Sequence, residues 1–422
     1  MFGDTPLVMV ETQAALEAAV ARLRESPVLG VDTESDSFHH YQEKVCLVQI
    51  SDLHHDYVID PLAVRDLGPL GPVMADRSVV KIFHGADYDV VSLKRDFGFQ
   101  VANIFDTMLA AQFLHLPRVG LADLIGRWFG HAIDKKWQRH DWASRPLLTE
   151  HLEYARGDTH FLPALREVLQ KRLAAAGRLA PVLEECEVLE GRSWQGRTHD
   201  PSDFLRVKGA AQLSEAERRV LRAVYAYRDD EARGMDRPAF KVIPDPVLLD
   251  IARAQPRDAD AVTAMMRKGS SLARRHGAGL AAAVGRGLED SAPLPTSAPR
   301  EPKGPPDVLR ARDSERLMAM LKDWRNRLVA PMNAAPTTVA SNGLLREIVR
   351  LAPTTLEALG QVPDIRRWQL ATHGEAIVEI VSRVATDGTT GDAETDDAAP
   401  ARRKRRRKPR RTGDAPAVHA EA

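Results

Sequence analysis

An α/β domain with a mixed sheet and flanking helices, followed by two small all-α domains, is the fold that the sequence predicts. Three closely spaced apolar runs indicate hairpin-like strands, and strand and helix patterns then alternate, which is typical of a mixed sheet covered by helices. Beyond about residue 180 the strand patterns fade and helical patterns dominate. The expected strands are LVMV (7–10), VLGVD (28–32), VCLVQI (45–50), DYVID (56–60) and VVKIFH (79–84).

Helical patterns lie between and after these strands. Thr12 is placed to cap a helix that runs to about Glu25, since apolar residues recur at helical spacing behind it. With the strands, these helices fill a first domain that we expect to span residues 1–180. The other expected helices cover 87–97, 107–116, 121–129 and 149–175.

Two helical units make up most of the second half. The first is expected at 210–290, where Ser214 opens a capping-box pattern. Residues 291–307 are rich in Pro, Ser and charge, which predicts a linker, and the second unit is expected at 308–385. Residues 386–422 contain an acidic patch, a basic run and almost nothing apolar, so we expect a disordered tail.

Composition excludes several classes of protein. The 422 residues, of which 44% are hydrophobic and 28% charged, are typical of a globular protein with more than one core. Two cysteines are too few for a disulfide framework or a thiolate metal site, and they fit a reducing compartment. Since the first residues lack a signal-peptide pattern and no apolar run approaches the length of a membrane span, we expect a cytoplasmic protein without membrane segments.

The basic residues are unevenly distributed. Nine of the 59 Lys and Arg residues lie within 401–411, which leaves 50 elsewhere against 59 acidic residues. Clustered Lys and Arg bind RNA by releasing counterions, although solubility, ribosome adhesion or attraction to membranes are alternative roles for such a run. The residues expected to contact nucleic acid are Arg402, Arg403, Lys404, Arg405, Arg406, Arg407 and Lys408.

An alternating pair of acids ends the predicted strand 28–32. Asp32 and Glu34 are two residues apart, so in a strand both side chains project from the same face. Two such carboxylates repel unless a cation lies between them, and Mg²⁺ and Mn²⁺ take oxygen ligands. The pair therefore predicts half of a metal site, with a solvated strand end as the alternative.

Two later motifs also contain acids. In HGADYD (84–89), Asp87 and Asp89 fall in the first turn of a helix, where acids also stabilise the helix dipole without any catalytic role. Tyr154 and Asp158 are spaced i, i+4 and share one helix face, which could equally be an amphipathic surface.

Together these motifs resemble the DEDDy 3′→5′ exonucleases, and the sequence between them is similar to the ribonuclease D family. The helical units resemble the HRDC (helicase and RNase D C-terminal) domain, the first clearly and the second more weakly. The resemblance implies a ribonuclease H-like exonuclease domain followed by two HRDC-type domains. The matching stretches are VCLVQIS, KIFHGADYDV, FDTMLAAQFL, GLADLIGRWFG and IDKKWQRHDWASRPL in the first domain, and ARGMDRPAFKVIPDPVLLDIARAQP, RLMAMLKDWRNRLV and RRWQLATHGEAIVEIV in the helical units.

The resemblance also implies a catalytic set. Two divalent ions, Mg²⁺ or Mn²⁺, are implied as cofactors, with Tyr154 orienting the attacking water because a phenol pKa of about 10 hinders full proton abstraction. Asp87 competes with Asp89, but the spacing from His84 selects Asp89, and Asp106 is expected to cap a helix. The implied metal ligands are Asp32, Glu34, Asp89 and Asp158.

The activity implied is that of a 3′→5′ exoribonuclease releasing 5′-monophosphates, with precursor tRNAs that have free 3′ ends as substrate and tRNA 3′ maturation as the process. Two alternatives stay open: a DNA-directed 3′→5′ exonuclease, and a non-catalytic nucleic-acid-binding scaffold. The complete set of five residues argues against the scaffold. No phosphate-binding loop of a helicase and no zinc-binding HExxH motif occurs in the sequence.

Two other stretches are candidate RNA contacts. Residues 135–142 (KKWQRHDW) combine basic and aromatic groups, which either bind the RNA 3′ end or pack a loop against the last helix of the domain. In the first helical unit, a turn flanked by basic residues could meet the phosphate backbone. These basic residues are Arg267, Lys268, Arg274 and Arg275.

Overall fold

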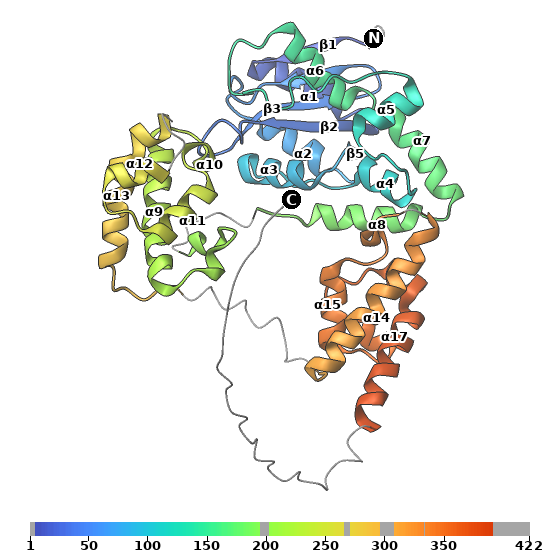
Figure 1. The fold of residues 1–422 in the computed structure, drawn as a ribbon. Coiled ribbons are helices and arrows are strands. Elements are labelled where there is room, and N and C mark those ends of the chain that lie inside the picture. The colour runs from blue at the N-terminus through green and yellow to red at the C-terminus, as the bar shows by residue number, and fades with distance from the viewer. Residues whose placement is uncertain (1–4, 195–201, 266–270, 296–307, 333, 391–422) are drawn as a thin grey trace, which may run out of the picture.

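The computed structural model describes residues 5–194, 202–265, 271–295, 308–332 and 334–390. Within these ranges it consists of an α/β domain and two separate helical domains, as the sequence predicts (Figure 1). No helix in the described part of the chain is both long enough and apolar enough to cross a membrane.

A six-stranded mixed sheet forms the centre of the first domain, in the order β1-β4-β3-β2-β5-β6. Strand β2 lies in its interior, antiparallel to β3 and parallel to β5. The last strand, β6, was not predicted, because three residues carry too little of an alternating pattern to be read. The strands are β1 (Leu7–Val10), β2 (Val28–Ser35), β3 (Val45–Ser51), β4 (Asp56–Ile59), β5 (Val80–Phe83) and β6 (Ile104–Asp106).

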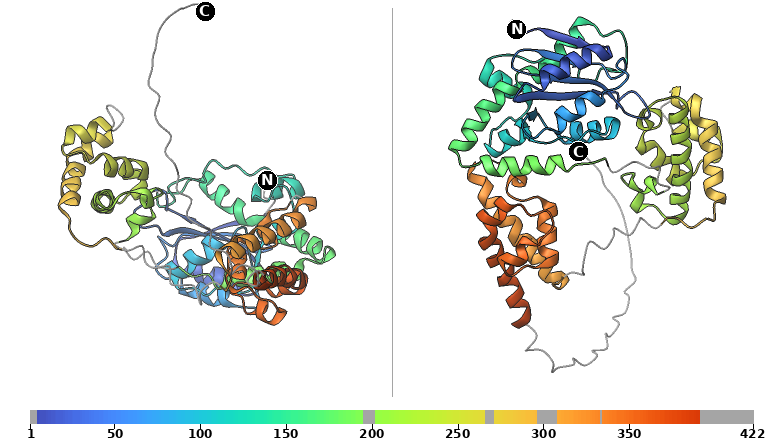
Figure 2. Two further views of the ribbon diagram at one scale, coloured as in Figure 1. Left: turned by 60° about the horizontal axis from the view of Figure 1, so that its bottom comes forward. Right: turned by 180° about the vertical axis from the view of Figure 1, so that it is seen from behind.

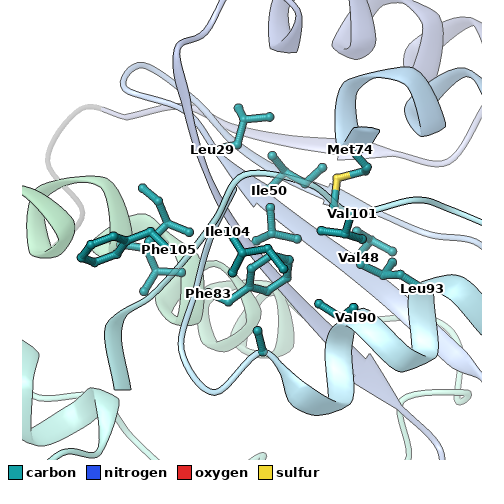
Figure 3. Close-up of a cluster of buried hydrophobic side chains, with 14 of the residues drawn as sticks. Leu29, Val48, Ile50, Met74, Phe83, Val90, Leu93, Val101, Ile104 and Phe105 are labelled. Atoms are coloured by element: carbon teal, nitrogen blue, oxygen red, sulfur yellow. The ribbon is translucent and has the colours of Figure 1, made fainter. Parts of the chain in front are cut away.

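Helices cover both faces of this sheet. On one face, α3 supplies Val90 and Leu93 to a core with Val48 and Ile50 of β3 (Figure 3). The helix predicted at 149–175 is divided at Phe161 into α6 and α7, and Pro163 in the first turn of α7 cannot donate the backbone hydrogen bond that a continuous helix needs. The helices are α1 (Gln13–Leu23), α2 (Gly71–Ala75), α3 (Asp87–Phe97), α4 (Thr107–Phe113), α5 (Leu121–Phe129), α6 (Thr149–His160), α7 (Leu162–Ala175) and α8 (Leu179–Glu190).

The helical domains each have their own hydrophobic core. Ser214 forms the predicted capping box with Glu217 at the start of α9. In the second domain, α17 continues to Thr390, five residues past the expected boundary at 385. The first domain contains α9 (Glu215–Gly234), α10 (Ala239–Val242), α11 (Asp245–Ala254), α12 (Ala259–Met265) and α13 (Ser271–Glu289), and the second contains α14 (Ala311–Val329), α15 (Asn342–Leu351), α16 (Leu356–Gly360) and α17 (Arg367–Thr390).

The first helical domain docks on the loop that joins β2 to β3. The phenol of Tyr41 donates to both oxygens of Asp229 at 2.8 and 2.9 Å. Its backbone N–H donates to Asp236, which also lies 2.8 Å from the ring nitrogen of His40. Because Glu34 lies at the end of β2, this domain holds the loop immediately after one of the candidate metal ligands.

The second helical domain docks elsewhere, on α8 (Figures 1 and 2). The start of α17 brings the backbone of Arg367 and Trp368 to the carboxylate of Glu184, with N–O distances of 2.6 and 3.0 Å. The Trp368 ring also packs edge-on against Phe113 of α4. The two helical domains therefore contact different parts of the α/β domain.

We expect Tyr41→Phe to loosen the first helical domain, because the phenol loses a hydrogen bond to a charged partner, worth about 1.5–3 kcal/mol. Small-angle X-ray scattering should show a larger radius of gyration for this variant. Tyr227→Phe is the matched control, since that phenol contacts His276 inside the same domain. An identical scattering curve for Tyr41→Phe and the wild type would contradict the docking role.

Candidate active site

Three carboxylates meet at the end of β2. Asp32 and Glu34 project from the strand, and Asp158 approaches from α6. Each offers an oxygen within 4.8 Å of the oxygens of the other two. The fold thus brings Asp158 into one cluster with two acids that lie more than 120 positions earlier in the sequence.

Asp89 reaches the same strand from α3. Its carboxylate accepts hydrogen bonds from the backbone N–H and the hydroxyl of Thr33, at 3.1 and 2.6 Å. Since Thr33 lies between Asp32 and Glu34, the fourth acid is tied directly to the strand that carries them. The competing Asp87 is 68% exposed and pairs with Arg192, outside the cluster.

Helix α6 comes unusually close to β2, because Gly30 leaves room for it. A Cβ atom at Gly30 would lie 2.7 Å from the carbonyl oxygen of Thr159. The hydroxyl of Thr159 also lies 2.7 Å from that of Ser51 on β3. A larger residue at position 30 would push Asp158 away from the other acids.

A buried ion pair fastens the same helix to β4. The guanidinium of Arg156 donates to the carboxylate of Asp56 at 2.6 and 2.9 Å, and a ring nitrogen of His160 lies 2.9 Å from it. Burial alone would raise the pKa of Asp56, but hydrogen bonds from His160 and Ser51 hold it below its ordinary value. Removal of either charged partner from such a pair leaves an uncompensated buried charge.

Tyr154 lies one helical turn before Asp158. Its ring stacks on that of Trp142, with centroids 5.8 Å apart and planes inclined by 29°. Burial and the charges of Asp158 and Glu34 raise the pKa of its phenol further above its already high value. The phenol therefore keeps its proton near neutral pH and can donate a hydrogen bond.

The loop before α6 is held by Arg145. Its guanidinium forms two hydrogen bonds with Asp60, at 2.7 and 2.8 Å, and donates to the carbonyl oxygens of Cys46 and Trp142. Trp142 is 1% exposed, so it packs the loop against α6, which is one of the two roles expected for this stretch. Trp137 lies edge-on to His151 and beneath the ammonium of Lys136.

Asp106 has the capping role that was expected. One carboxylate oxygen accepts from the first turn of α4, and the other accepts from the backbone N–H groups of Gly85 and Ala86. It therefore also fixes the turn that leads into α3 and Asp89. Of the basic residues expected near RNA, Arg274 and Arg275 are exposed, whereas Arg267, Lys268 and the basic run of the tail lie outside the described residues.

Sequence reasoning did not find the residues that support the cluster. Thr33 had a local signal, its position between two acids, whereas Arg145 and Arg156 act on partners about 85 and 100 residues away. Such contacts become visible only in the folded chain.

The pKa values of the four acids are all raised. Burial, and then the charges of neighbouring acids, raise the pKa of both Asp32 and Glu34. Burial raises the pKa of Asp89 to about 6, and burial with the charge of Asp89 raises the pKa of Asp158 to about 7.

A divalent cation fits this donor set. Within the described residues, no Lys or Arg forms a salt bridge with Asp32, Glu34 or Asp158. Clustered carboxylates of this kind either keep protons or bind a cation, and hard ions such as Mg²⁺ and Mn²⁺ prefer oxygen ligands. The acids and their spacing therefore suit divalent metal binding.

The comparisons with known proteins agree with this arrangement. Residues 7–174 match the 3′-5′ exonuclease family, and residues 217–284 and 314–381 each match the HRDC domain, so the second, weaker resemblance is confirmed. The exosome complex component 10 homolog of Caenorhabditis elegans is 34% identical over 265 residues, which are 62% of this chain and 30% of that protein. The present chain thus spans about a third of the length of that relative.

The similarity to ribonuclease D is far more extensive. Ribonuclease D of Gluconacetobacter diazotrophicus is 32% identical over 373 residues, 87% of this chain and 91% of that protein. The crystal structure of Escherichia coli RNase D, described as an exoribonuclease involved in structured RNA processing, is 25% identical, with a TM-score of 0.65 over 89% of this chain and 98% of that one. Since the similarity runs through nearly the whole of both chains and includes both helical domains, the protein belongs to the ribonuclease D family.

Proposed function

We propose that the protein is a 3′→5′ exoribonuclease, which hydrolyses the terminal phosphodiester bond of RNA and releases 5′-monophosphates. The observation that carries this proposal is the carboxylate cluster at the end of β2, within a domain of the 3′-5′ exonuclease family. Its relatives named ribonuclease D favour RNA over DNA as the substrate.

We assign the candidate residues as follows. Asp32, Glu34 and Asp158 would hold one divalent ion, and Asp32 with Asp89 would hold a second. Two such ions, when bound, would neutralise phosphate charge and make a nucleophile of water at neutral pH. Mg²⁺ or Mn²⁺ is the proposed metal, because the ligands are carboxylate oxygens.

Tyr154 orients the attacking water in this proposal. Its protonated phenol can donate a hydrogen bond, and stacking on Trp142 fixes the plane of its ring. Arg145 holds the loop that carries Trp142. Catalysis by these residues is therefore a matter of placing the water and the scissile phosphate in line.

Precursor tRNAs with free 3′ ends are the proposed substrates, in the cytoplasm. This assignment rests on the ribonuclease D relationship and on the structured RNA processing ascribed to the E. coli relative. Exposed Arg274 and Arg275 of the first helical domain and residues 402–408 of the tail are the proposed contacts to the phosphate backbone.

Asp32→Asn should abolish cleavage. Loss of one ligand charge removes several kcal/mol of transition-state stabilisation, which corresponds to a drop of roughly a thousandfold in rate. Asp87→Asn is the matched control: the same change on an exposed acid of the neighbouring motif should keep the rate within about twofold.

The assay compares 3′-labelled and 5′-labelled strands of RNA and DNA with Mg²⁺, Mn²⁺ or EDTA. Shortening of RNA from its 3′ end, dependent on metal and absent in Asp32→Asn, is the expected outcome. Faster shortening of DNA would favour the DNA-directed alternative. No shortening of either strand would favour a binding scaffold.

Without metal, the site should make the protein less stable as pH rises from about 4 to about 7. The side chain of Asp in an unfolded chain has a pKa of about 3.9. Asp89 and Asp158 have pKa values of about 6 and 7 in the fold, so within this window the folded state binds more protons and its unfolding free energy falls with pH.

Urea unfolding in EDTA at pH 5 and pH 7.5, repeated with Mg²⁺, measures this effect. Mg²⁺ should restore stability at the higher pH, and Asp158→Asn should have a smaller pH dependence than the wild type in EDTA. Equal pH dependence in both proteins would show that Asp158 does not contribute.

Replacement of the seven basic residues at 402–408 by Gln should weaken RNA binding and reduce its dependence on salt. The slope of log Kd against log salt should fall by about 0.7 for each phosphate of single-stranded RNA that the tail no longer neutralises. Fluorescence anisotropy across a NaCl series measures the slope. The turnover rate at saturating RNA is the internal control and should not change. An unchanged slope would show that the tail does not contribute to RNA binding.

A further inference from the structure

Thr33 carries a hydroxyl group on the apolar face of β2. Side chains alternate along a strand, so Thr33 points away from the face of Asp32 and Glu34. Its partner across the sheet is Val48, which belongs to the hydrophobic core that α3 covers (Figure 3). A valine would suit this position as well, since β-branched apolar residues favour strands. The hydroxyl group of Thr33 therefore requires a separate explanation.

Both hydrogen-bond donors of Thr33 converge on one oxygen of Asp89. The hydroxyl donates to Oδ1 at 2.6 Å, and the backbone N–H donates to the same atom at 3.1 Å. A carboxylate oxygen has about two lone pairs, so two donors fill the accepting capacity of Oδ1. In the described part of the chain, no neighbouring residue donates a hydrogen bond to the second oxygen, Oδ2. Asp89 can therefore offer one oxygen, and not two, to a cation.

The carboxylate of Asp89 acts on the cluster from short range. Burial first, and then the charge of Asp89, raise the pKa of both Asp32 and Asp158. The energy of such an interaction falls with the distance between the charges, so a large effect requires close approach. Asp89 is thus near enough to the other acids to share a cation, or a water bound to it, with Asp32.

We infer that Thr33 is a positioning residue for the second ion: by occupying Oδ1 of Asp89, it leaves Oδ2 as the oxygen available to the cation or its bound water, and so favours Mg²⁺ and Mn²⁺ over Ca²⁺. The inference rests on the proposed metal-binding role of the cluster. Mg²⁺ requires near-octahedral geometry, whereas Ca²⁺ takes about six to eight oxygens and accepts both oxygens of one carboxylate. An acid restricted to one oxygen suits the smaller ions.

Thr33→Val is the first test, because it replaces the hydroxyl by a methyl group of similar size. Mn²⁺ affinity should fall by about tenfold, the low end of the range for groups that orient metal ligands, since the backbone N–H still holds Oδ1. Ca²⁺ affinity should be retained, because Oδ1 becomes available as a further ligand atom. The ratio of Mn²⁺ to Ca²⁺ affinity therefore falls. Titration calorimetry with each ion on the full-length protein measures this ratio.

Two further variants separate this role from a loss of stability. Thr33→Ser keeps the hydroxyl and should retain the wild-type affinity for both ions. Thr338→Val is the matched control, because Thr33 and Thr338 are both 8% exposed and the Thr338 hydroxyl donates to the carbonyl oxygen of Ala335 at 2.7 Å in the second helical domain. This change should lower the melting temperature in EDTA, since a hydrogen bond is lost, and leave both affinities unchanged.

The affinity ratio decides the inference. An unchanged ratio of Mn²⁺ to Ca²⁺ affinity in folded Thr33→Val would overturn it, and so would a Thr33→Ser protein with the same reduced ratio as Thr33→Val. If Thr33→Val does not fold, Thr33→Ala takes its place, because Ala and Ser at this position differ only by the hydroxyl.

Failure of the proposed function gives a different result. If the wild-type protein binds Mn²⁺ but shortens no RNA, the exonuclease assignment fails while the affinity ratio still decides the role of Thr33. If the wild type shortens RNA and the ratio is unchanged in Thr33→Val, the inference fails and the function stands. Absence of Mn²⁺ binding by the wild type would overturn both.

Discussion

Mutual repulsion among four clustered carboxylates, of which Asp89 is buried and the other three are half-buried, is the constraint around which the first domain is organised. No described basic side chain forms a salt bridge with Asp32, Glu34 or Asp158, so the fold itself must hold these groups together. A central strand supplies two of them, and the helices on its opposite faces supply the others. Burial makes the repulsion stronger, because it removes the solvent that would screen the charges.

The surrounding contacts oppose this repulsion from several directions. Gly30 lets α6 lie close to the sheet, the pair of Arg156 and Asp56 fastens that helix, and Thr33 secures Asp89. These contacts align the acids as well as stabilising the fold. Precise placement of ligands in a metal site depends on such support, since the ligands alone do not fix their own orientation.

The mixed sheet and both helical domains could be predicted from the sequence because local patterns encode them, whereas the five candidate residues were selected by the resemblance of their motifs to a known family. Sequence reasoning missed β6, which is only three residues long, and the division between α6 and α7. The supporting residues were also beyond its reach. The partners of Arg145 and Arg156, Asp60 and Asp56, are set by how the strands and helices pack, which cannot be read from neighbouring residues.

The docking of both helical domains has a practical consequence for work on fragments. A fragment that ended after α8 would expose the Tyr41 phenol without Asp229, and would leave Glu184 without the backbone donors of α17. The loop after Glu34 would then be free to take other conformations. Cleavage rates measured on an excised nuclease domain would therefore describe a site whose β2–β3 loop is no longer held by the first helical domain. Comparison with the intact chain would measure how much this contact contributes to the rate.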